Sequence, residues 1–115
     1  MRIPAISFLL TLLLLSDLRA AEPMKAKEAF EKHLFVTRGS PVYPSALERL
    51  GVRGDGVFEM EFDYESGRVR DVRILRSTGN RVLDRNAVIA LKHWRAKPRS
   101  IHTLQLPLSF GVPPQ

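Results

Sequence analysis

The sequence predicts a single α+β domain, in which a three-stranded antiparallel sheet is covered on one face by two helices. Alternating apolar residues mark three strands, within 56–64, 69–74 and 103–110. An apolar stripe of helical spacing within 83–94 marks an amphipathic helix. The chain has 115 residues, of which 44% are hydrophobic and 26% are charged, so it can build one modest core.

The strand at 56–64 separates apolar from acidic side chains. Its two faces are Phe58, Met60, Phe62 and Tyr64 on one side, and Glu59, Glu61 and Asp63 on the other. On the next strand, Arg73 is expected to pair with these carboxylates across the outer face. Exposed ion pairs of this kind stabilise a fold by about 0.5 kcal/mol each. We therefore interpret the acidic face as solvated sheet surface.

A hairpin turn is predicted at residues 65–67, where Glu-Ser-Gly supplies turn chemistry and Gly67 has a structural role. Beyond the turn, Val69 and Val72 are three residues apart, which breaks the two-residue period of a strand. This spacing predicts a β-bulge at Arg70–Asp71.

The strand order follows from the connections. Because the helix joins the second strand to the third, these two strands run in the same direction. The sheet is fully antiparallel only if the first strand lies between them, in the order 2-1-3. The third strand, which alternates apolar residues from Leu104 to Phe110, then lies at an edge of the sheet.

The helical stretch LDRNAVIALKHWRAKP, at 83–98, carries the residues that we expect to hold the helix on the sheet. They share one face and are structural: Leu83, Ala87, Leu91 and Trp94. The only tryptophan of the chain lies at the end of this stripe, just before Pro98 turns the chain towards the third strand. We expect the ring of Trp94 to anchor this corner of the domain.

Residues 1–20 predict a signal peptide. They contain Arg2, an apolar run over 3–15 and small residues before Ala21. The run is shorter than the roughly 20 residues that span a bilayer, so cleavage and export to the periplasm are expected. In the alternative, an uncleaved N-terminus anchors the chain in the inner membrane.

Residues 21–39 are predicted to be a linker or a short helix. Apolar residues recur there at every fourth position: Ala26, Phe30 and Leu34. This pattern within 22–35 indicates a short amphipathic helix. Further on, Ser45 is expected to cap a second short helix that Gly51 ends.

Several stretches follow one another in the order and spacing of a known family. They are PVYPSALERLGVRGDG at 41–56, SGRVRDVRILRSTGN at 66–80, LDRNAVIALKHWRAKP at 83–98 and LPLSF at 106–110. Together they resemble the C-terminal domain of the TonB family of energy transducers. The resemblance defines a domain over 40–112 and implies a sheet of three antiparallel strands with two helices.

The resemblance also implies a function without catalytic residues, metal or cofactor. In the family, this domain binds an extended segment of an outer-membrane transporter in the periplasm, and its last strand accepts that segment as an added strand. The residues that match the partner-binding regions are Ser40, Pro41, Val42, Tyr43, Gln105, Pro107, Ser109 and Phe110.

Pro107 sharpens this expectation because proline cannot donate a ladder hydrogen bond, so its backbone must face an open flank. The backbone groups of Gln105 and Ser109 point to the same side as those of Pro107. We expect the two N–H groups and the Pro107 carbonyl to form a docking edge. The alternative is that Pro107 only protects an edge strand from aggregation.

Composition leaves other partners open. The chain has a formal net charge of +6, but its charges alternate in sign, which does not favour nucleic acid. A competing function is an envelope module that binds acidic glycan such as peptidoglycan through its arginines, and a homodimer is also open.

Glu59 and Glu61 have the spacing of a glycosidase pair, yet no pocket is implied. The three histidines lack ligand spacing, and the absence of cysteine excludes disulfides.

Overall fold

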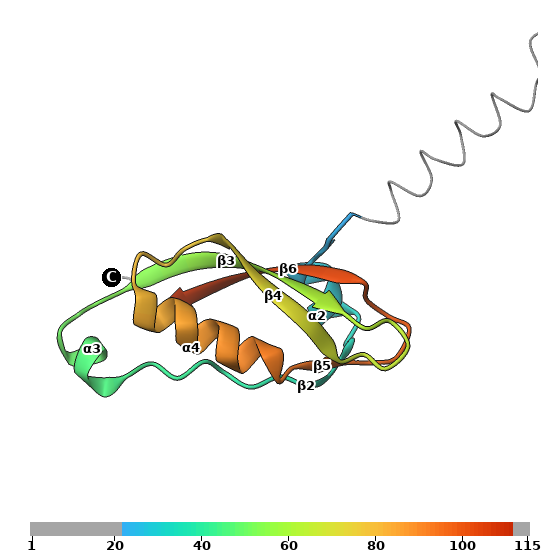
Figure 1. Ribbon diagram of the computed structural model, residues 1–115, viewed down its shortest axis with the longest axis horizontal. Helices are drawn as coiled ribbons and strands as arrows, with labels where there is room; N and C mark the ends of the chain where they lie inside the picture. Colours follow the sequence, from blue (N-terminus) through green and yellow to red (C-terminus); the bar gives the residue numbers. More distant parts are fainter. Residues whose placement is uncertain (1–21, 112–115) are drawn as a thin grey trace, which may run out of the picture.

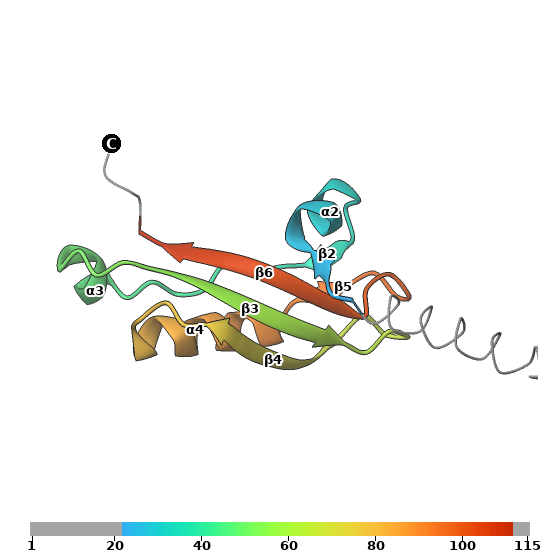
Figure 2. The same ribbon diagram turned by 90° about the horizontal axis from the view of Figure 1, so that it is seen from above.

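The computed structural model describes residues 22–111, so the predicted signal peptide at 1–20 lies outside the described residues. A four-stranded sheet has the order β1-β6-β3-β4, and β2 pairs with β5 in a separate small sheet (Figures 1 and 2). The strands are β1 (Met24–Lys25), β2 (Phe35–Thr37), β3 (Gly54–Phe62), β4 (Val69–Arg76), β5 (Arg95–Ala96) and β6 (Thr103–Phe110). The helices are α2 (Ala26–Glu31), α3 (Ser45–Arg49) and α4 (Arg81–Lys92).

The predicted order of the three long strands is confirmed, because β3 lies between β4 and β6 and is antiparallel to both. The predicted number of strands is wrong. A fourth strand, β1, pairs in parallel with β6, in the registers Met24 with Leu104 and Lys25 with Gln105. A linker or a short helix was expected in this part of the chain, and a strand of two residues is too short to leave an alternating pattern.

Two of the three helices place a buried residue against the inner face of the sheet. α4 runs along β4 and β3, whereas α2 lies at the β6 side and buries Ala29 (Figure 2). α3 sits at one end of the molecule and has no buried residue (Figure 1). Ser45 does not cap α3, because the N-cap is Pro44 and no side chain bonds there. Gly51 ends this helix as expected, with φ +70°.

The β3–β4 hairpin contains the predicted bulge. Its register shifts between Glu61, opposite Asp71, and Phe62, opposite Val69, so Arg70 is the extra residue. A second, unpredicted shift between Val57 and Phe58 makes Leu75 the extra residue, and Ile74 and Leu75 are 44% and 45% exposed.

The expected ion pair across the outer face is present. A guanidinium nitrogen of Arg73 lies 2.6 Å from a carboxylate oxygen of Glu59, its register partner on β3. Arg70 approaches Glu61 and Asp63 at 3.6 and 3.9 Å. The acidic face of β3 is therefore partly neutralised by arginines of β4.

The hairpin turn docks tightly on β5 through Gly67. Gly67 has φ +78°, its N–H donates to the Asp63 carbonyl at 2.8 Å, and its own carbonyl accepts from Ala96 N–H at 2.8 Å. A Cβ atom built at position 67 would lie 2.0 Å from the backbone oxygen of Ala96. Both the backbone conformation and the close approach therefore require glycine here.

The core joins the inner face of the sheet to α4 and to the N-terminal segment. Its buried apolar residues are Ala29, Phe58, Met60, Phe62, Leu83, Ala87, Leu91, Trp94, Ala96, Ile101, Leu104, Leu106 and Phe110. The ring of Trp94 meets Phe35 and Phe30 edge-on, with centroids 5.1 and 6.4 Å apart. Its indole N–H donates to the Gly39 carbonyl at 2.7 Å. Trp94 thus ties the end of α4 to the segment that begins with β1 and α2.

The start of α4 is fixed by a network of side-chain hydrogen bonds. Asn80 caps the helix and accepts from the N–H groups of Val82 and Leu83. Partial burial acts to raise the pKa of Asp84, but hydrogen bonds from Ser77 and Thr78 outweigh it and hold this pKa below its ordinary value. The charged form of Asp84 therefore stabilises the fold.

We predict that Trp94→Ala lowers the free energy of unfolding by about 3–5 kcal/mol, because it removes a buried ring between three elements. Trp94→Phe keeps an aromatic ring but loses the N–H donor, so about 1–2 kcal/mol is expected. Circular dichroism during urea unfolding measures both, since each variant lacks the only tryptophan. An unchanged midpoint for Trp94→Ala would contradict this packing.

Gly67→Ala and Gly79→Ala form a matched pair, because both glycines have positive φ but only Gly67 approaches a backbone atom. We expect Gly79→Ala to destabilise the protein by about 1–2 kcal/mol through its backbone conformation alone. Gly67→Ala should destabilise it by more than about 3 kcal/mol. Thermal unfolding compares the two, and equal losses would show that the contact with Ala96 does not matter.

Acid sensitivity is predicted to depend on Asp84. Because its pKa is lower in the folded state than in the unfolded state, its stabilisation is present above the unfolded pKa and is lost as pH falls through the folded pKa. Asp84→Asn should therefore be less stable than the parent near neutral pH, and the difference should shrink below about pH 4. Urea midpoints measured across this range test the prediction, which a constant difference would contradict.

Candidate functional site

The candidate site is the flank of β6 that faces away from β3. Opposite residues on antiparallel strands alternate between hydrogen-bonded and non-hydrogen-bonded pairs. Pro107 lies opposite Val57 and has no N–H, so this pair is not hydrogen-bonded. By alternation, the backbone groups of Gln105 and Ser109 also point away from β3. The bond from Phe62 N–H to the His102 carbonyl, at 2.9 Å, agrees with this pattern on the β3 side.

β1 covers one half of this flank. The expectation that β6 forms the rim of the sheet is therefore corrected, because Lys25 of β1 is the register partner of Gln105. The Lys25 ammonium also donates to the side-chain oxygen of Gln105. The backbone of Gln105 is thus taken by the chain itself. Over 106–110, no other strand among residues 22–111 pairs with this flank, which leaves the Pro107 carbonyl and both backbone groups of Ser109 open.

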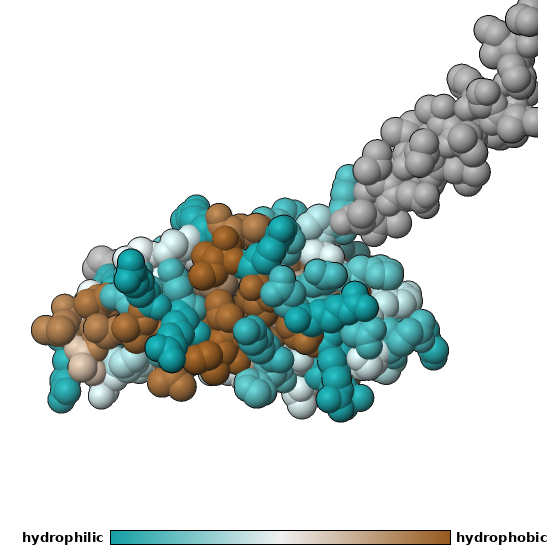
Figure 3. Space-filling model, in the orientation of Figure 1, coloured by the Kyte–Doolittle hydropathy of each residue, from teal (hydrophilic) through white to brown (hydrophobic). Residues whose placement is uncertain are grey.

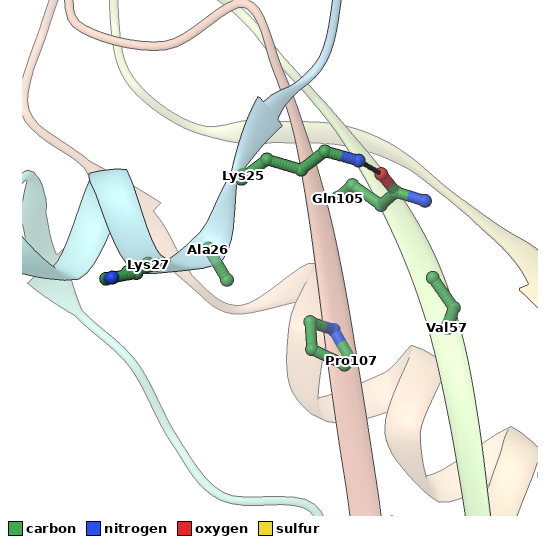
Figure 4. A pocket seen from close by; sticks show the side chains of 6 residues that line it. All are labelled: Lys25, Ala26, Lys27, Val57, Gln105 and Pro107. Atoms are coloured by element: carbon green, nitrogen blue, oxygen red, sulfur yellow. Dashed lines mark hydrogen bonds between the residues drawn. The ribbon is translucent and has the colours of Figure 1, made fainter.

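A cavity of about 330 Å³ lies where β1 ends and the open flank begins. It is lined by residues of β1, α2, β3 and β6: Lys25, Ala26, Lys27, Val57, Gln105 and Pro107 (Figure 4). In Figure 4, Lys25 reaches across to Gln105, whereas the amine of Lys27 points away from Pro107. No pattern in the sequence indicates this cavity, because its walls depend on the unpredicted pairing of β1.

A second cavity, of about 500 Å³, lies at the other end of the open flank. Its lining residues are Tyr43, Glu48, Gly51, Arg53, Ser109 and Gly111. The ring of Tyr43 meets Phe110 edge-on at 5.7 Å, and its hydroxyl donates to the Val52 carbonyl. The structure therefore brings Tyr43, Ser109 and Phe110 together.

The rest of the first region lies elsewhere. Ser40 and Val42 are exposed and belong to the extended segment that runs beside α4 (Figure 1). The Val42 carbonyl accepts a hydrogen bond from Asn86 of α4 at 2.8 Å. Neither Ser40, Pro41 nor Val42 lines either cavity on the β6 flank.

The other edge of the sheet, β4, is less suited to strand addition. Two register shifts interrupt it, and Arg70, Arg73 and Arg76 lie along it; both features protect an edge strand from pairing. Apolar side chains gather on the neighbouring face of β4 and α4 (Figure 3). They are Ile74, Leu75, Val82 and Ile89, each between 44% and 50% exposed.

Two of the side chains considered for catalysis or metal binding have structural partners. Glu59 is held by Arg73, and His102 stacks on Tyr64 with ring centroids 3.9 Å apart. Within 22–111, no group of three histidine, aspartate or glutamate residues is placed to hold a metal ion. No helix in the same range has the length and apolar character needed to cross a membrane.

Comparison with known proteins agrees with this fold. The structure matches that of the TonB C-terminal domain of Pseudomonas aeruginosa, determined in solution, with a TM-score of 0.60 and 22% identity over 70% of this chain and 87% of that one. Protein TonB of Vibrio cholerae is 26% identical over 78 residues, and Protein TonB of Xanthomonas campestris is 30% identical over the same length. These alignments cover 63% of this chain and about a third of each relative, 32% and 34%. Residues 39–112 match the family model described as Gram-negative bacterial TonB protein C-terminal, and the chain belongs to this family.

Proposed function

We propose that this chain is a non-catalytic binding module of the bacterial envelope that takes up an extended segment of an outer-membrane transporter. The segment adds as a strand beside residues 106–110, in transport of the TonB type. The observation that carries the proposal is the open flank of β6, where the Pro107 carbonyl and the Ser109 N–H and carbonyl lack a strand partner within the described range. Main-chain hydrogen bonds to such a flank give affinity, and adjacent pockets give specificity.

Family membership supports this function, because the relatives that carry the same domain are named Protein TonB. The predicted signal peptide would deliver the module to the periplasm, where the transporter segments are accessible. The open flank is short. Three backbone groups that gain about 0.5–1.5 kcal/mol each support weak and reversible binding. A transient contact of this kind suits a partner that must be released.

A second function has one observation in its favour. Four arginines on or near β4 and α4 have no carboxylate within 4 Å among residues 22–111: Arg68, Arg76, Arg81 and Arg85. They could hold acidic glycan of the cell wall. Sedimentation of the purified protein with isolated sacculi tests this function, and binding that moderate salt abolishes would support it.

Ser109→Pro is the variant that tests strand addition. It removes one N–H from the open flank but no hydrogen bond to β3, so the fold should persist with a thermal midpoint close to that of the parent. The probes are synthetic peptides that copy the N-terminal periplasmic segments of the outer-membrane transporters of the same organism. We expect the parent to bind at least one of them and Ser109→Pro to bind it about two- to tenfold more weakly.

Ser109→Ala is the matched control, because it keeps the backbone N–H and removes only the exposed hydroxyl. Titration calorimetry of both variants separates a backbone role from a side-chain role. Undiminished binding by folded Ser109→Pro would contradict docking at this flank.

Sedimentation equilibrium of the free protein shows whether a second copy competes for the same edge.

A further inference from the structure

We propose that β1 and the first turn of α2 form a fixed stop on the β6 flank, and that the cavity beside this stop receives one aliphatic side chain of the docked segment. The proposal rests on strand addition at 106–110. It names the part of this chain that ends the docking flank. It also names the kind of side chain that the docked segment places beside that end.

The stop is fixed because α2 is anchored in the core. Ala29, four residues after Lys25, is 0% exposed, and its carbonyl accepts from Leu34 N–H at 3.1 Å. The ring of Phe30 lies 5.3 Å from that of Phe35 and 6.4 Å from that of Trp94. Lifting β1 from β6 would strain or break these contacts. A docked strand is therefore confined to the part of the flank beyond Gln105.

The cavity beside the stop presents hydrocarbon to an incoming side chain. Its floor and walls include Val57, Pro107 and Ala26 (Figure 4). The polar ends of the other lining residues are directed elsewhere, since Lys25 binds the side chain of Gln105 and the Lys27 amine lies 4.0 Å from Glu31. An aliphatic side chain gains free energy by covering this hydrocarbon, whereas a carboxylate would give up water for a lining that is mostly apolar.

The position of the cavity fits a strand in the open half of the flank. Pro107 and Val57 lie opposite one another, and both project from the outer face of the sheet. On a strand added beside β6, alternate side chains project to that same face. The residue that stands next to Pro107 can therefore place its side chain in the cavity.

Host peptides test this inference on the full chain. Each is an eight-residue threonine peptide, blocked at both ends, in which one position in turn carries leucine, glycine or aspartate. Binding is followed by the amide NMR signals of Leu106, Leu108, Ser109 and Phe110. We expect one varied position at which the leucine peptide binds about tenfold more tightly than the glycine peptide. The aspartate peptide should bind no more tightly than the glycine peptide at that position.

Ala26→Leu should abolish this preference for leucine, because the added side chain fills the cavity. Val57→Thr is a second variant, which keeps the shape of the floor but makes it polar, and should weaken the preference. Ala46→Leu adds the same bulk at an exposed residue of α3 and should leave the preference intact. A leucine preference that persists in folded Ala26→Leu and in Val57→Thr would overturn the proposal.

Peptide length tests the stop. Peptides extended by three threonines at either end should bind within about twofold of the parent peptide, and the amide signals of Met24 and Lys25 should keep their paired positions. Tighter binding that shifts these two signals towards unpaired values would show that β1 can be displaced, and would overturn the stop.

If neither host peptides nor transporter segments perturb residues 106–110, strand addition itself fails. Binding without any guest preference overturns the cavity alone.

Discussion

The missing amide hydrogen of Pro107 is the constraint on which the organisation of this domain depends. A proline can stand in β6 only where its nitrogen faces away from the neighbouring strand, and this fixes the direction of every backbone group along β6. The backbone groups of the even-numbered residues of β6 must bond to β3. Those of Gln105, Pro107 and Ser109 must face the flank. One residue therefore determines both the hydrogen bonding of β6 to β3 and which backbone groups of β6 face the flank.

The N-terminal segment divides this flank into an occupied and an open half. β1 pairs with Leu104 and Gln105, and α2 is held by Ala29 and by the aromatic contacts of Phe30 with Trp94. This segment precedes residues 39–112, which match the family model. The part of the chain that matches the family model supplies β6, and a segment outside that match covers one end of its flank.

The elements that could be predicted from the sequence are those whose residues repeat a regular pattern. The alternation in β3 and β6, the stripe on α4 and the three-residue spacing at Arg70 each report local geometry directly, so the strand order and the bulge were predictable. β1, the second bulge at Leu75 and the cavity beside Ala26 depend on contacts between distant segments. Two paired residues leave no periodic pattern in the sequence. The pairing of Gln105 with Lys25 of β1 was therefore not predictable.

Amide hydrogen exchange distinguishes an open flank of β6 from a covered one. In the free protein, the amides of Leu106, Leu108 and Phe110 should be protected by β3, and that of Gln105 by β1, whereas the Ser109 amide should exchange at the rate of an unpaired group. A bound transporter segment should then protect Ser109. Protection of Ser109 already in the free monomer, or none when the segment is bound, would contradict an open flank that accepts a strand.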